Sequence, residues 1–264
     1  MDERADSSVG GSGHLLTDDD PAPVAVENRG GRSTLMLVGD HAGREIPFRL
    51  GKLGLGPADL ERHIAWDIGV AGLGGLLALR IDAIFVRQRY SRLVIDCNRA
   101  PGHPGSIAEV SDGTAIPGNV GSSEADRQAR VDEIFEPYHQ AVAAVLDERQ
   151  AAGRATILLA LHSFTPSMGG FDRPWRFGVL HRRDSAFSHA ILAALRTRWG
   201  DEVGDNQPYS MDEIDYTVPR HVDPRGIDYL ELEVRQDLIE TPAQQKDLIE
   251  PLAGVLDEAL AALG

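Results

Sequence analysis

The sequence lacks several features that would assign a class of protein at once. It contains a single cysteine, Cys97, so no disulfide can form within the chain and no cysteine pair is available for structural zinc. No apolar run reaches the roughly 18 residues needed to cross a bilayer. The acidic N-terminus also lacks the basic and apolar regions of a signal peptide. We therefore expect a cytoplasmic protein.

Basic residues are scarce, and two common catalytic motifs are missing. The 26 Lys and Arg residues against 41 Asp and Glu residues give a formal net charge of −15. Such a surface repels phosphate backbones and anionic lipids, so we expect neither a nucleic-acid nor a membrane partner. The sequence has no P-loop motif for nucleotide phosphates and no GxSxG motif for a serine hydrolase.

Short apolar runs bounded by turn residues alternate along the chain with segments of helical periodicity. The runs predict strands at residues 34–38, 83–87, 93–96, 156–162, 176–180 and 229–234. Helices are predicted at residues 65–79, 124–149, 187–199 and 248–263. Pro137 should kink or divide the second helix. This alternation predicts a layered α/β fold with a largely parallel or mixed sheet.

The first 30 residues differ in composition from the rest of the chain. They are polar, charged and rich in glycine, which is typical of a flexible tail. No linker-like segment divides the remainder. We therefore expect a flexible N-terminal tail over residues 1–30 and one domain over residues 31–264.

Polar side chains follow several of the predicted strands, at the point where each apolar run ends. They are Asp40 and His41, then Asp96, Asn98 and Arg99, then His162, and finally Glu231, Glu233 and Arg235 on one face of the last strand. Ligand sites in α/β folds gather beyond the carboxyl ends of the strands. We therefore expect these side chains to contribute to one site.

These residue types suit hydrolysis of an amide. Two histidines and one carboxylate bind zinc and leave a position for water, whose pKa the metal lowers. A separate glutamate can then take a proton and pass it to the leaving amine. Arginine matches a substrate carboxylate. We expect one Zn²⁺ per chain, or another divalent metal, and an acidic small-molecule substrate.

Two residues are candidates for the third metal ligand, in addition to His41 and His162. Glu45 follows His41 by four residues on the same predicted loop. Asp67 lies in the otherwise apolar segment HIAWDIG, where a carboxylate needs a partner. Asp67 is preferred for this reason, and Glu45 remains the alternative.

Motifs spread over about residues 35 to 240 resemble the N-formylglutamate amidohydrolase family. They are GDHAGREIP, HIAWDIG, YSRLVIDCNRAP, IPGN, PYH, LHSFTP, DRPWRFGVL, GDNQPYS and LEVRQDLI. The family in turn is similar to the zinc carboxypeptidase and aspartoacylase group. The resemblance implies a three-layer α/β/α domain with a mixed central sheet, as in the carboxypeptidases.

The resemblance also implies a reaction and a role for each matching residue. The reaction is hydrolysis of N-formyl-L-glutamate to formate and L-glutamate. The roles are zinc binding by His41 and His162, general base and acid for Glu233, and binding of the substrate carboxylate by Asn98 and Arg99 with help from Arg92.

One difference from the carboxypeptidase-like groups leaves the identity of the third metal ligand undecided. The carboxypeptidase-like groups have a metal-binding glutamate three residues after the first histidine, where this chain has Arg44. Two alternative functions also remain: a metal-free binding protein for acidic metabolites, and a deacylase for another acyl group. The sequence does not determine the oligomeric state.

Overall fold

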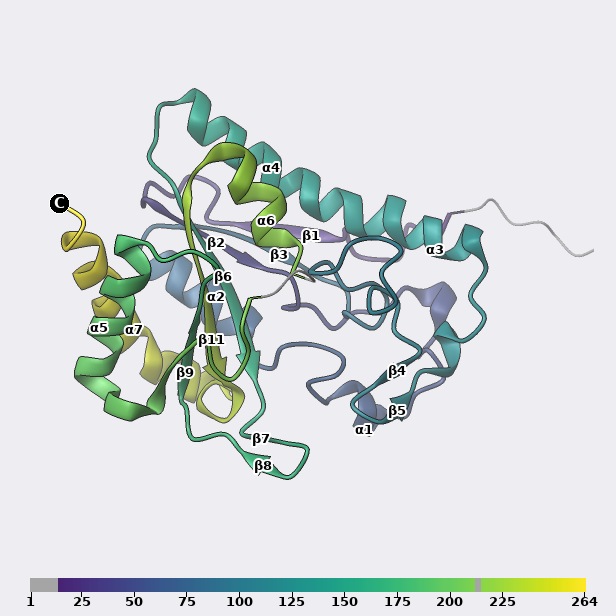
Figure 1. The fold of residues 1–264 in the computed structure, drawn as a ribbon. Helices are drawn as coiled ribbons and strands as arrows, with labels where there is room; N and C mark the ends of the chain where they lie inside the picture. The colour runs from purple at the N-terminus through teal and green to yellow at the C-terminus, as the bar shows by residue number, and fades with distance from the viewer. Residues whose placement is uncertain (1–13, 212–214) are drawn as a thin grey trace, which may run out of the picture.

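The structure, a computed structural model, describes residues 14–211 and 215–264 and has a mixed seven-stranded central sheet (Figure 1). Its strands, in spatial order, are β1 (Val24–Glu27), β3 (Ile84–Gln88), β2 (Leu35–Gly39), β6 (Ile157–Phe164), β11 (Asp228–Arg235), β9 (Phe177–Leu180) and β10 (Val203–Asp205). The four strands β3, β2, β6 and β11 are parallel, whereas β1 and β9 run antiparallel to their neighbours in the central group. The predicted mixed sheet is confirmed.

Helices cover both faces of this sheet, which makes the predicted three-layer α/β/α arrangement (Figure 1). One face packs against α2 (Val70–Arg80), α5 (Ala186–Trp199) and α7 (Pro242–Ala261). The other packs against α4 (Glu136–Ala151) and α6 (Thr217–Val222). Side chains alternate between the faces, so that Leu159 joins the first core and Leu158 the second.

The predicted helix over residues 124–149 forms, and it is interrupted before its proline. Ser123 caps α3 (Glu124–Arg130) in a capping box with Asp126. A π-helical turn at Val131–Phe135 then joins α3 to α4. Pro137 has no N–H to donate to the preceding turn, so the wider turn lies where the regular bonding pattern fails.

The predicted strand at residues 93–96 is wrong. Both edges of β3 are already occupied, by β1 and β2, so the segment that follows it cannot join the sheet there. Leu93 and Val94 are instead buried in the core beneath α4. Side chains satisfy the backbone: Asn119 Nδ2 donates to the Leu93 carbonyl at 2.9 Å and Arg130 Nη1 to the Val94 carbonyl at 2.9 Å.

The predicted tail boundary at residue 30 is also wrong. Residues 24–27 form β1, the edge strand paired with β3. Leu15 is buried, and its N–H donates to Glu133 Oε1 at 2.6 Å. The strand has only four half-buried residues, shows no apolar–polar alternation and follows two prolines, so the sequence pattern did not indicate a strand. Residues 1–13 of the predicted tail lie outside the described residues.

The remaining α-helices and strands of the described residues are short, and the sequence pattern did not predict them. They are α1 (Pro57–Leu60), β4 (Val110–Ser111), β5 (Thr114–Ala115), β7 (Ser167–Met168) and β8 (Phe171–Asp172), together with β10 and α6. Among the helices of residues 14–211 and 215–264, none combines the length and apolar character required to cross a membrane.

Two buried histidines join α4 to α6. His139 Nε2 lies 3.0 Å from the carbonyl oxygen of Cys97, and His139 Nδ1 lies 3.0 Å from His221 Nε2. Since a carbonyl only accepts, Nε2 of His139 carries its proton, and Nδ1 of neutral His139 accepts from His221. Burial lowers the pKa of His139 to about 2 and that of His221 to about 3.

We expect these two histidines to make the fold acid-sensitive. Their pKa values are lower in the folded than in the unfolded chain, so the folded state binds fewer protons and loses stability as the pH falls below about 6.5. Between pH 7 and pH 5 each histidine should cost about 2 kcal/mol. Urea unfolding at both pH values should therefore show a loss about 2 kcal/mol smaller in His221→Asn than in the wild type. The exposed control His189→Asn should keep the wild-type loss, and equal losses in all three proteins would contradict the assignment.

Candidate metal centre and active site

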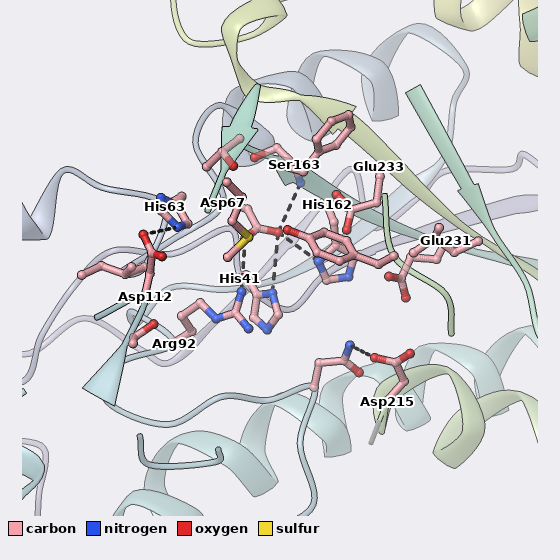
Figure 2. A pocket seen from close by; sticks show the side chains of 18 of the residues that line it. His41, His63, Asp67, Arg92, Asp112, His162, Ser163, Asp215, Glu231 and Glu233 are labelled. Atoms are coloured by element: carbon pink, nitrogen blue, oxygen red, sulfur yellow. Dashed lines mark hydrogen bonds and ion pairs between the residues drawn. The ribbon is translucent and has the colours of Figure 1, made fainter. Parts of the chain in front are cut away.

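A cavity of about 340 Å³ lies at the ends of the central strands, on the face of the sheet that packs against α4. Alternation along β6 and β11 sends His162, Glu231 and Glu233 to this face of the sheet, and the register places Glu233 beside His162. His41 and Asp67 reach the same cavity from the loops that follow β2 and precede α2. Figure 2 shows these five side chains grouped around one space. The predicted convergence is therefore present for His41, His162, Glu231 and Glu233, whereas Arg235 is not among the lining residues and pairs with Asp237 at 2.7 Å.

His41, Asp67 and His162 form a buried cluster whose possible ligand atoms all lie within 4.8 Å of one another. Asp67 Oδ2 lies 2.9 Å from His162 Nδ1 and 3.6 Å from His41 Nδ1. The backbone N–H of Asp67 donates to the His41 carbonyl at 2.8 Å, which ties the two loops together. Two atoms that bind the same ion, each at about 2.0–2.2 Å from it, lie about as far from each other as the possible ligand atoms of this cluster do. The cluster therefore fits a small divalent cation.

Two further carboxylates face the outer sides of the imidazoles. Asp96 Oδ1 lies 2.8 Å from His41 Nε2, and Asp40 Oδ2 lies 3.7 Å from His162 Nε2. Asp40 also accepts a hydrogen bond from the Tyr138 hydroxyl on α4. Metal-binding histidines commonly carry such a carboxylate on the nitrogen that does not bind the ion. His41 Nδ1, the nitrogen turned toward Asp67, is buried without a hydrogen bond.

The charges of the cluster favour a cation at its centre. Burial opposes ionisation of Asp67, but His41 and His162 outweigh it and lower the pKa of this carboxyl. Burial would likewise lower the pKa of His162, but the charges of Glu231 and Asp67 raise it well above its ordinary value. The carboxylates thus hold protons on the imidazoles. A divalent cation would supply the same positive charge and release those protons.

Two glutamates on β11 line the cavity beside this cluster. Burial is the largest cause that raises the pKa of Glu233 to about 8 and that of Glu231 to about 7. Glu233 Oε2 is buried without a hydrogen bond. On the neighbouring strand β9 the partner of Glu233 is Gly178, where an added Cβ would lie 2.2 Å from the Gln207 carbonyl oxygen. The missing side chain lets the segment after β10 pass close to Glu233 and bring Tyr209 to the cavity.

Asn98 and Arg99 line the cavity from the loop that follows residues 93–96, the segment wrongly predicted to be a strand. Asn98 Oδ1 accepts from the backbone N–H groups of Tyr216 at 2.9 Å and Thr217 at 3.0 Å. Asp215 Oδ1 lies 3.1 Å from Asn98 Nδ2 and 3.3 Å from Arg99 Nη1. The side-chain donors of both residues therefore already face a carboxylate of the protein.

Arg92 lines the same cavity but is also engaged within the protein. Its Nε and Nη2 both donate to Asp96 Oδ2, at 3.1 and 2.6 Å. Since the other oxygen of Asp96 faces His41, Arg92 fixes the carboxylate that orients this histidine.

The comparisons with known proteins agree with this geometry. Residues 33–240 match the N-formylglutamate amidohydrolase family. The chain belongs to this family. The comparison with curated proteins found no match.

Two solved structures are similar over most of the chain. A gene product from Agrobacterium tumefaciens is 35% identical, with a TM-score of 0.90, over 95% of this chain and 99% of its own. The N-formylglutamate amidohydrolase from Ralstonia eutropha is 20% identical, with a TM-score of 0.66, over 92% of this chain and 98% of its own. Both similarities show that the fold is shared over nearly the whole length of each chain.

Within the family fold, the structure separates the two candidates for the third ligand. Asp67 lies against both histidines, whereas Glu45 is exposed and is absent from the cluster. Arg44, at the position of the usual glutamate, forms an exposed ion pair with Glu61 at 3.0 Å. The argument that a carboxylate in the apolar segment HIAWDIG needs a partner therefore selected a residue that the fold brings to the cluster.

The sequence predicted neither the roles of two carboxylates nor some of the cavity residues. Asp96 and Asp40 were expected at the site as strand-end residues, but nothing in the sequence distinguishes an orienting carboxylate from a ligand. Asp215 and Tyr209 belong to a turn-rich region, and no local pattern indicates which of its residues turn inward. Asp215 reaches Arg99 across 116 positions of the chain, and a contact of this kind depends on the tertiary fold.

Proposed function

We propose that the protein is a metal-dependent amidohydrolase that cleaves the amide of an N-acyl amino acid. The observation that carries the proposal is the buried His41–Asp67–His162 cluster, which shares one cavity with Glu233. N-formyl-L-glutamate, named in the family description, is the first substrate to test. Zn²⁺, one per chain, is the proposed ion because two imidazoles and a carboxylate suit it, although other divalent metals share these ligands.

In this proposal each side chain of the site has a separate role. His41, Asp67 and His162 would hold the cation, and Asp96 and Asp40 would orient the two imidazoles. When bound, the cation supplies a Lewis acid that polarises the amide carbonyl and makes water more acidic.

Glu233 would move the proton. It would take a proton from the water that attacks the acyl carbon and then deliver it to the nitrogen as the carbon–nitrogen bond breaks. The products are a carboxylic acid, which is formate for a formyl group, and the free amine of the amino acid. A pKa raised to about 8 by burial suits a carboxylate that must hold a proton for part of the cycle at neutral pH.

Asn98 and Arg99 would bind the α-carboxylate of the substrate. A guanidinium has five N–H donors, and in this structure Arg99 uses Nη1 for Asp215 and for the Asn98 carbonyl. Arg92 would contribute positive charge to the same cavity while it holds Asp96. A small-molecule partner and the cytoplasmic location expected from the sequence belong to this proposal.

The proposal is tested by measuring formate or acetate release from N-formyl- and N-acetyl-amino acids by the zinc-loaded protein. We expect turnover that falls at least about 100-fold after chelation and returns when Zn²⁺ is restored. Binding of the same compounds by a metal-free protein, with no turnover under any metal condition, would support the alternative of a binding protein. Turnover of acetyl but not formyl substrates would instead identify a different deacylase.

A further inference from the structure

The inner part of the cavity contains a carboxylate whose role is not explained by metal binding or proton transfer. Glu231 is only 5% exposed, and it lines the cavity two residues before Glu233 on β11. Its neighbours on the adjacent strands are Ala160 on β6 and Leu180 on β9, which have no side-chain donors. No hydrogen bond among the described residues reaches the Glu231 carboxylate. In Figure 2 this carboxylate points into the cavity.

The positive charges that favour an ionised Glu231 are those of His162 and His41, and both histidines already face other protein carboxylates. Asp215, which also lines the cavity, adds negative charge near Glu231 and already faces Asn98 and Arg99. Arg92 is engaged by Asp96. Both arginines that line the cavity therefore already face a protein carboxylate, and the second carboxylate of an N-acyl glutamate would meet Glu231 without a cation of its own.

A buried carboxylate without a donor is costly, and a ligand that brings a positively charged donor removes that cost. Ala160, the paired residue on β6, is buried in the core and has only a methyl group, so it offers Glu231 no donor. A donor from the substrate is thus the group that this end of the cavity lacks.

We propose that Glu231 is a specificity residue that binds the ammonium or guanidinium group of an amino-acid side chain. The substrate class is then the N-acyl derivatives of basic amino acids, with the scissile amide at the His41–Asp67–His162 cluster. This inference rests on the proposed amidohydrolase function and replaces the acidic side chain of N-formyl-L-glutamate by a basic one.

The test compares three N-formyl amino acids of similar backbone: arginine, glutamine and glutamate. For the zinc-loaded wild type, we expect kcat/KM for the arginine derivative to exceed that for the glutamine derivative by at least about 10-fold, with glutamate lowest. In Glu231→Gln the ratio of arginine to glutamine should fall at least about 10-fold. The exposed control Glu240→Gln should keep the wild-type ratio.

Binding provides a second readout that does not need turnover. In the Glu233→Gln background, calorimetry with N-formyl-arginine should give a Kd that rises at least about 10-fold when Glu231→Gln is added. A wild-type preference for the glutamate derivative, or a Kd unaffected by Glu231→Gln, would overturn the role of Glu231. Absence of turnover with every N-acyl substrate would instead contradict the proposed function, while the binding result still decides the inference.

Discussion

Replacing Glu233 with glutamine should lower kcat by about 10²–10⁴-fold, the usual contribution of general acid–base catalysis. The glutamine is isosteric and still fits between Gly178 and His162, but it cannot take a proton from water. Metal binding should be unaffected, because Glu233 lies outside the cluster of possible ligand atoms. Steady-state kinetics with zinc content measured on the same sample tests both parts.

Two controls separate proton transfer from general disturbance of the cavity. Glu233→Asp keeps the carboxylate on a shorter side chain and should recover part of the lost rate, whereas a purely structural role gives no such rescue. The exposed Glu240→Gln should retain wild-type kcat. A Glu233→Gln enzyme that keeps its metal and works at near-normal rates would show that another group, for example Glu231, moves the proton.

The residues of the candidate site that could best be predicted from the sequence are those at the ends of apolar runs. His41 and His162 could be found because the runs before them are buried on both faces, as the structure confirms for β2 and β6. A strand of this kind ends at a defined edge of the sheet, so its last polar residue has a known position. Asp67 was found by a different argument, namely the cost of an unpaired carboxylate in an apolar segment.

Prediction from the sequence failed where a short apolar run can be either a strand or a buried loop. Leu93 and Val94 form an apolar run like that of a strand, but their side chains pack under α4 while side-chain donors satisfy the backbone. In β1 the opposite occurred, since a four-residue, half-buried edge strand is too short to show a periodic pattern. In both cases the outcome depends on which strand edges are free, and a local window does not contain that information.

Replacing Asp67 with asparagine should remove the metal from the protein. Even residues that only orient metal ligands are worth about 10–100-fold in affinity, so loss of an anionic ligand should cost more than 100-fold. Asparagine has the same shape but no charge to offset the cation, and Asp67 is the one carboxylate among the three clustered residues. Zinc content after dialysis against a weak chelator should fall from near one to below about 0.1 per chain.

The matched control for this variant is Glu45→Gln, which makes the same change of charge at the rejected candidate. Glu45 is exposed, so its variant should keep wild-type zinc content and activity. Thermal unfolding with and without Zn²⁺ adds a readout that is independent of catalysis, because an ion that binds only the folded state stabilises it. The wild type and Glu45→Gln should gain stability with Zn²⁺, and Asp67→Asn should not. Zinc retained by Asp67→Asn but lost by Glu45→Gln would reverse the assignment, since the ligand would then have to come from the loop after His41.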